Sequence, residues 1–256
     1  MTDEDRPTAE ELAAIIEEHK NEGTFINLNH ARKIYANRIA RAQRKEEARP
    51  LYEDLREAGF GVESIYDLLQ FDDEQAEAVI PIVLRHVVCD YNYITRFELV
   101  DWGLRDKAYS AETTSVLLDV YSSIDEGFFK DNLASRIADH GHESLVERIV
   151  NIVADPDTGD TRVILATYLV RVLKTETALE IVQPLLKMDQ KWVAEVIEAL
   201  GEKRAVHARK EIVPFLEHSD SYVRERARRA VSKIDARIRR DFKARNRIKK
   251  PRKPRK

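Results

Sequence analysis

The chain has 256 residues, of which 43% are hydrophobic and 35% are charged, and it contains only 8 glycines and 8 prolines. This composition favours a helical protein with short loops, built as one elongated array or two compact domains. No apolar run approaches the roughly 20 residues of a membrane span, the acidic N-terminus is unlike a signal peptide, and the single cysteine, Cys89, cannot form an internal disulfide. We therefore expect a cytoplasmic protein in a reducing compartment.

The net charge of −3 is distributed unevenly along the chain. Residues 237–256 contain 12 Lys or Arg and one acid, Asp241, so this segment carries +11 and the preceding 236 residues carry −14. An acidic body with a basic end is a pattern that partner binding can explain. We divide the chain into a helical array over residues 1–236 and a basic, partly disordered extension over residues 237–256.

Residues 8–45 predict two helices joined by a turn at Gly23. Thr8 and Glu11 have the spacing of a capping box. One side of the second helix is basic with no acid among its side chains: Arg32, Lys33, Arg38, Arg41, Arg44 and Lys45. We expect a solvated face that pairs with the acidic first helix, and the alternative is a stripe that faces phosphates.

Residues 47–69 predict another helical hairpin. Pro50 opens its first helix, and Gly59 and Gly61 form its turn. Apolar side chains at helical spacing are expected to face inward: Leu51, Leu55, Val62, Ile65, Leu68 and Leu69.

Two more hairpins are predicted between residues 72 and 139. In the first, a helix over residues 72–88 contains Pro81, which bends it, and the second helix covers residues 90–104. The other hairpin pairs residues 110–121 with residues 125–139, after which Gly141 breaks the chain.

The last part of the body repeats itself. Residues 181–200 align with residues 212–231 after a shift of 31, and residues 149–157 align with residues 181–189 after a shift of 32. In the last repeat, Asp220 or Ser221 can cap a second helix whose apolar stripe must be buried. That stripe consists of Val223, Ala227, Ala230, Val231 and Ile234.

A proline-containing helix, then an aspartate, then Val-Arg at the start of a second helix resembles the HEAT repeat, including its short bacterial PBS-lyase form. The last repeat matches through Pro214, Asp220, Val223 and Arg224, whereas Val193 replaces the arginine one repeat earlier. The resemblance implies an all-α superhelix, a HEAT-like α-solenoid of about seven helical hairpins.

Solenoids of this kind present their second helices on a concave face, so the resemblance implies a non-catalytic scaffold that binds a protein partner there. The exposed residues that we expect to contact the partner are Arg96, Arg162, Tyr168, Arg171, Lys191, Glu195, Arg224 and Arg228.

Catalytic and metal-binding motifs are weak in this sequence. The one histidine cluster, His140 to Glu143, lies in a predicted turn, where such residues are usually solvated. Deoxyhypusine hydroxylases, which are HEAT-repeat enzymes, bind iron through several His-Glu pairs, but only His142-Glu143 is present here. We expect no enzyme activity, no cofactor and no metal.

The alternative is a DNA glycosylase with HEAT-like repeats, of the AlkD type, in which tryptophans and an aspartate face the DNA. Trp102 and Asp106 are four residues apart, and Trp192 follows later, but Gly103 is expected to end the helix between the first two. The acidic body also opposes duplex binding, so we interpret both tryptophans as packing residues.

The basic extension is the most distinctive segment outside the repeats. Ile238 and Phe242 can continue the last helix until Pro251 and Pro254 prevent it. We expect either an electrostatic arm for nucleic acid or an acidic protein, or a solubilising end. The residues expected to contact a polyanion are Arg239, Arg240, Lys243, Arg245, Arg247, Lys249 and Lys250.

Overall fold

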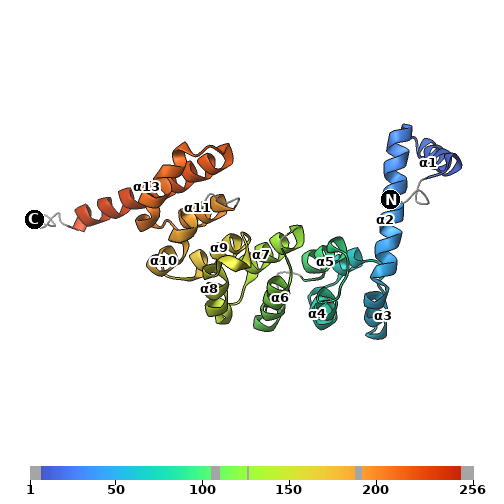
Figure 1. Ribbon diagram of the computed structural model, residues 1–256, viewed down its shortest axis with the longest axis horizontal. Coiled ribbons are helices and arrows are strands. Elements are labelled where there is room, and N and C mark those ends of the chain that lie inside the picture. The colour runs from blue at the N-terminus through green and yellow to red at the C-terminus, as the bar shows by residue number, and fades with distance from the viewer. Residues whose placement is uncertain (1–6, 105–109, 126, 188–191, 249–256) are drawn as a thin grey trace, which may run out of the picture.

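The computed structural model describes residues 7–104, 110–125, 127–187 and 192–248. Within these ranges the regular structure is helical and there is no strand, which confirms the all-α class. The helices follow one another in chain order along the long axis, from α1, α2 and α3 at one end to α13 at the other (Figure 1).

The first two helices, α1 (Ala9–Asn21) and α2 (Leu28–Glu47), form a pair with its own core. Leu12 and Ile15 of α1 are buried with Ala31 of α2, in a cluster separate from the main one. The predicted capping box is present, because the Thr8 side chain accepts the Glu11 N–H and the Thr8 N–H donates to the Glu11 carboxylate.

The basic side of α2 forms ion pairs with three different segments. Arg38 pairs with Glu18 of α1 at 2.7 Å, as expected for a face that meets the acidic first helix. Arg44 instead approaches Glu98 at 3.9 Å, and Lys45 approaches Glu63 at 3.7 Å. These contacts neutralise part of the face, which favours the solvated interpretation over a stripe that faces phosphates.

The body contains paired helices joined by short connections. Its helices are α3 (Arg49–Glu57), the 3-10 helix η2 (Ile65–Gln70), α4 (Asp73–Val87), α5 (Tyr93–Glu98), the π-helix η3 (Leu99–Gly103), α6 (Ala111–Ser123), α7 (Phe128–His140), α8 (Val146–Ala154), α9 (Arg162–Val172), α10 (Thr175–Leu186), α11 (Val193–Glu202), α12 (Arg209–Ile212), the 3-10 helix η8 (Val213–Glu217) and α13 (Ser221–Ile248). Three short 3-10 turns complete the order: η5 (Glu143–Leu145), η6 (Pro156–Thr158) and η7 (Val206–Ala208).

The second helices of successive pairs pack in one row. In this row α5 contacts α7, α7 contacts α9, α9 contacts α11, and α11 contacts α13. The first helices pack beside them, with α3 on α4, α4 on α6, and α8 on α10. One hydrophobic cluster runs through both rows, from Ala48 to Ile234.

Basic side chains cross-link the C-terminal ends of the second helices. Arg136 of α7 binds Asp101 of η3 at 2.5 Å, and Arg171 of α9 binds Asp139 of α7 at 3.2 Å. Further along, Lys203 at the end of α11 donates to the Arg171 carbonyl at 3.0 Å, and Lys233 of α13 pairs with a glutamate of α11. The partners are 35, 32, 32 and 31 residues apart. Cations placed against helix C-termini also complement the helix dipoles.

The second half of the 47–69 hairpin differs from the prediction. It forms only the short 3-10 helix η2, and Leu69 is 43% exposed rather than buried. Ser64 and Asp67 cap this helix, because Asp67 accepts the N–H groups of Glu63 and Ser64 at 2.8 and 2.9 Å. A six-residue 3-10 helix has three residues per turn, so its buried face cannot hold all the apolar positions of an α-helix.

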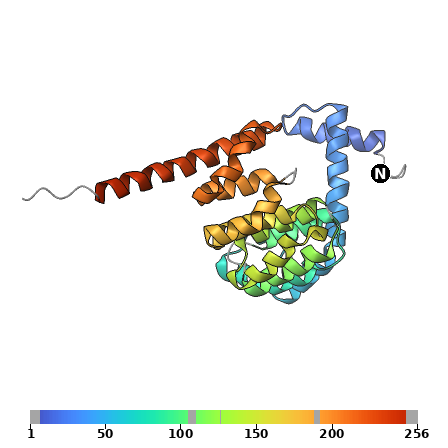
Figure 2. The ribbon, with the colours of Figure 1, turned by 60° about the vertical axis from the view of Figure 1, so that its left-hand side comes forward.

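The last helix, α13, contains the expected stripe, in which Val231 is only partly buried. Val223, Ala227, Ala230 and Ile234 are at most 4% exposed, and Asp220 accepts the Tyr222 N–H at 2.8 Å as a cap. The helix continues past residue 236, the predicted end of the array, to Ile248. Its C-terminal half projects away from the rest of the protein (Figures 1 and 2).

Candidate binding site

Two of the residues expected on the partner-binding face are buried. Arg162 and Tyr168 are 6% and 4% exposed, so the prediction that they are exposed is wrong. The helix that carries them, α9, packs against α7, α8 and α11, and every residue from Arg162 to Val170 is buried. The Arg162 guanidinium donates to the Val153 carbonyl at the end of α8, at 2.8 Å. A single apolar stripe cannot reveal that a helix is covered on all sides.

Two other predicted residues bind backbone carbonyls. Arg171 donates to the Ala138 carbonyl near the end of α7. Arg224 donates to the carbonyls of His218 and Ser219 at 2.5 and 2.7 Å, in the turn before its own helix. These arginines stabilise a helix end and a turn. Fewer of their N–H groups are therefore left to bind a partner.

The remaining predictions at the C-terminal end of the row have mixed outcomes. Glu195 is half-buried, and burial raises the pKa of its carboxyl, which accepts the Tyr222 hydroxyl at 3.4 Å. Arg228 is exposed and lies 3.8 Å from Glu225. Lys191 lies outside the described residues.

Arg96 is the predicted residue that lies beside a cavity. Asn92 caps its helix, α5, and accepts the Thr95 N–H at 3.0 Å. The Thr95 hydroxyl in turn donates to Glu47 at the end of α2, at 2.9 Å, which fixes the start of α5. The Arg96 guanidinium then lies 4.6 Å above the ring centre of Phe129 in α7.

An open cavity of about 410 Å³ separates the first turns of α5 and α7. We call it the α5–α7 cavity, and its lining residues are Tyr93, Arg96, Ile124, Asp125, Gly127, Phe128, Phe129 and Lys130. Tyr93 and Phe128 at its mouth are 58% and 61% exposed. The cavity therefore combines aromatic surface with two cations and one carboxylate.

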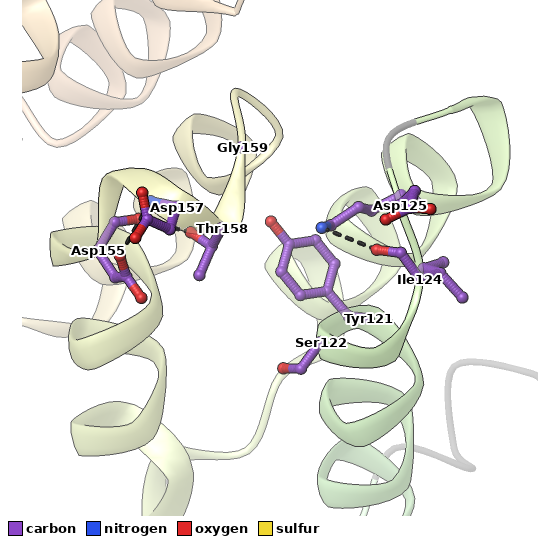
Figure 3. Close-up of a pocket in the computed structure, with 9 residues that line it drawn as sticks. Tyr121, Ser122, Ile124, Asp125, Asp155, Asp157, Thr158 and Gly159 are labelled. Atoms are coloured by element: carbon purple, nitrogen blue, oxygen red, sulfur yellow. Dashed lines mark hydrogen bonds between the residues drawn. The ribbon is translucent and has the colours of Figure 1, made fainter.

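Lys130 stands between this cavity and a second one of about 290 Å³. Its side chain is buried, its Nζ donates to the Ile124 carbonyl at 3.1 Å, and it lies 4.8 Å from the ring centre of Tyr121. Figure 3 shows Asp155 and Asp157 facing Tyr121 across the second cavity. The second cavity is therefore acidic, unlike the first.

Aromatic side chains continue from the cavity mouth across the surface. Phe128 contacts Tyr93 and Phe97, with ring centres 6.4 and 5.4 Å apart. Phe97 leads to Trp102 at 6.5 Å, and Trp102 lies 4.2 Å from Tyr66. We call these five residues the aromatic run. Rings at such distances attract one another, so the run is a continuous aromatic surface that is partly exposed.

The residues considered for a glycosylase do not share a site among the described residues. Trp102 belongs to the aromatic run, and its helix ends at Gly103, as predicted. Trp192 directly precedes α11 and packs against the core. The helices α7 and α9 lie between α11 and α5, which contacts the π-helix η3 that carries Trp102. Asp106 lies outside the described residues.

Two histidines, His142 and His86, have structural contacts. His142 accepts the Ser144 N–H at 3.2 Å and so caps η5. In the described part of the chain, no group of three His, Cys, Asp or Glu side chains is placed to hold a metal ion. His86 is buried between Tyr91, at 2.7 Å, and Asp54, at 3.1 Å. The arrangement resembles a catalytic proton relay, but its effect is to tether α4 to α3. Burial raises the pKa of Tyr91 to about 12, so its hydroxyl is a poor nucleophile at neutral pH.

The basic extension is helical as far as the structure describes it. Arg239, Arg240, Lys243 and Arg245 are exposed on the projecting half of α13. Arg247 lies in the same helix, whereas Lys249 and Lys250 lie outside the described residues.

Comparison with known proteins gives no relative: no family model matches the chain, and neither a curated protein nor a solved structure is significantly similar to it. Nowhere in the described ranges does a helix combine the length and apolar character that crossing a membrane requires.

Sequence reasoning missed Lys130, Tyr93 and Phe128. The signal that could have found them is an aromatic residue followed within one turn by a cation, at the start of two successive second helices: Tyr93 before Arg96, and Phe128 before Lys130. The repeat alignment did not extend that far towards the N-terminus, so this correspondence was not visible.

Proposed function

We propose that the two rows of helices form a HEAT-like α-solenoid. Support comes from the packing of each second helix on the next and from cross-links whose partners are 31 to 35 residues apart. This spacing matches the shifts of 31 and 32 that align the last repeats in the sequence. Elements that contact mainly their neighbours in the chain are the defining property of a solenoid.

We propose that this array is a non-catalytic scaffold for a protein partner. The observation that carries the proposal is the exposed aromatic run beside the α5–α7 cavity. Aromatic side chains with an arginine nearby are the residues that contribute most to binding energy at protein interfaces. The binding face is then formed by the N-terminal ends of α5 and α7, because the cross-links occupy the C-terminal ends of the second helices. The lone cysteine, Cys89, suits a cytoplasmic location.

A second candidate function is polyanion binding by the projecting half of α13. Five described cations are exposed there, away from the acidic body: Arg237, Arg239, Arg240, Lys243 and Arg245. Opposite signs on body and extension would allow the extension to attract nucleic acid or an acidic protein that the body repels.

Site-specific photo-cross-linking in the native host tests the scaffold proposal. A benzophenone side chain at position 128 or 93 should give discrete adducts with another polypeptide, which mass spectrometry then identifies and purified proteins confirm. Position 25 is the matched control, because Phe25 is 89% exposed and belongs to neither the run nor the cavity. Equal labelling at all three positions, or no adduct at positions 93 and 128, would contradict the proposal.

A further inference from the structure

Arg96 differs from several other half-buried arginines of the body because it forms no ion pair with a carboxylate among the described residues; Arg224 also forms none, but it donates to two backbone carbonyls. Arg136, Arg148 and Arg226 each contact an aspartate or glutamate. Arg96 lies on the Phe129 ring, its Nε is buried without a hydrogen bond, and the Asp90 carboxylate acts on its charge without forming an ion pair. Burial also lowers the pKa of its guanidinium. A partly desolvated guanidinium with an unfilled donor is costly, and a bound anion would offset that cost.

Lys130 adds a second cation to the same cavity. Its ammonium is buried, and its partners are a backbone carbonyl and an aromatic face rather than a carboxylate. Each cation therefore lies on an aromatic ring, Arg96 on Phe129 and Lys130 on Tyr121. Rings hold cations in place without neutralising their charge.

The backbone at the cavity also favours an anion. The helix α7 begins at Phe128 after Gly127, and no side chain in the described part of the chain caps it. Its first N–H groups and the positive end of its dipole lie at the cavity wall formed by Gly127, Phe128 and Phe129. In contrast, Asn92 caps the neighbouring helix α5.

The charge of the lining favours a singly charged anion. The described lining residues include two cations and one carboxylate, Asp125, and Asp90 also acts on the charge of Arg96. With these carboxylates nearby, a carboxylate is a better match than a phosphate dianion, and the acidic body disfavours a nucleic acid. The exposed rings of Tyr93 and Phe128 offer apolar surface next to the charged position.

From these observations we infer that the α5–α7 cavity binds the carboxylate of an Asp or Glu in an extended segment of a partner protein, with an adjacent apolar side chain against Tyr93 and Phe128. The carboxylate would accept hydrogen bonds from Arg96 and Lys130 and replace the missing ion pair of Arg96. This inference rests on the proposed scaffold function and specifies the chemistry of its partner.

Selection of phage-displayed random dodecapeptides on the full-length protein provides the probes. Peptides enriched on the wild type should share an Asp or Glu beside an aromatic or aliphatic residue. Fluorescence polarisation should show at least a tenfold loss of affinity for Arg96→Gln, and a similar loss when the shared acid of the peptide becomes its amide. Combining both changes should add little further loss, because each removes the same contact.

Two matched variants control for folding and general charge. Arg148→Gln removes another half-buried arginine, one that binds Asp119 in α6, and should change affinity less than twofold. Lys130→Arg keeps the positive charge in the cavity and should retain most of the binding.

Each failure has a distinct meaning for the two proposals. Peptides that bind at Tyr93 and Phe128 without a shared acid, or additive losses in the double change, would overturn the carboxylate inference while the scaffold proposal stands. Displacement of the peptides by inorganic phosphate or an oligonucleotide at lower concentrations than by acetate would show a phosphate site instead. If no peptide is enriched, the inference is wrong, and photo-cross-linking at position 128 decides the scaffold proposal independently.

Discussion

Gly201 of α11 lies against Ala230 of α13 so closely that a Cβ atom added to Gly201 would come within 2.6 Å of the Ala230 Cα and Cβ atoms. This approach brings two second helices of the row together at the end of the array. It explains why the apolar stripe of α13 contains Ala227 and Ala230 rather than larger residues, because close packing of two helices requires small side chains at the contact.

Gly201→Ala should therefore destabilise the protein although alanine favours helices. The added methyl group must push α11 and α13 apart, and overpacking of this kind costs about 1–3 kcal/mol. Urea denaturation followed by circular dichroism measures the change. Gly61→Ala is the matched control, because a Cβ there would meet nothing within 4 Å, and its stability should change little.

Ala227→Glu tests the same interface with charge. Ala227 is fully buried, so the carboxylate would enter a dry helix contact without a partner, at a cost on the order of 3 kcal/mol or more. Thermal unfolding should show a large fall in Tm. An unchanged Tm would mean that α13 does not pack as the repeat alignment and the structure both require.

Glu195→Gln should stabilise the protein at neutral pH. Burial raises the pKa of Glu195, so the folded state binds its proton more tightly than the unfolded chain. Stability associated with this group is then present below the ordinary glutamate pKa of about 4.3 and is lost as pH rises through the raised value. The amide avoids that loss and still accepts the Tyr222 hydroxyl.

Tm measured from pH 4 to pH 8 checks this sign. The variant should exceed the wild type at pH 7, and the difference should vanish near pH 4. Glu180→Gln, at an exposed position in α10, serves as the control and should follow the wild type throughout. A Glu195→Gln variant that is less stable at pH 7 would show that the carboxylate has a favourable partner.

Deletion of residues 237–256 should remove most polyanion binding and leave the helical body intact. The deleted part of α13 lies beyond the buried Ile234 and beyond Asp235, which pairs with Arg209 at 2.6 Å. Binding of the intact protein to generic RNA should weaken steeply with salt, with a log–log slope of several units if about six or more phosphates are engaged.

The basic side of α2 is the competing source of such binding. A variant with alanine at positions 38, 41 and 44 is the control, and it should keep its affinity because Arg38 and Arg44 are already paired within the protein. If the deletion variant binds RNA as tightly as the full chain, the extension is not the polyanion-binding segment.

The sequence predicted the helical class, the capping box at Thr8 and the buried stripe of α13 because each depends on local spacing that the chain displays directly. The exposure of Arg162 and Tyr168 could not be predicted, since it depends on how many neighbours cover α9. The α5–α7 cavity was missed for a related reason: Arg96 and Lys130 belong to different hairpins, and only tertiary packing brings them to one cavity.

Hydrogen–deuterium exchange on the full-length protein, with and without a selected acidic peptide, tests the central claim most directly. We predict slower exchange in segments 93–97 of α5 and 128–131 of α7 on binding, no change in α13, and loss of the effect in Arg96→Gln. Protection confined to α13 or to the basic side of α2, or protection at α5 and α7 that persists in Arg96→Gln, would contradict a carboxylate-binding site at this cavity.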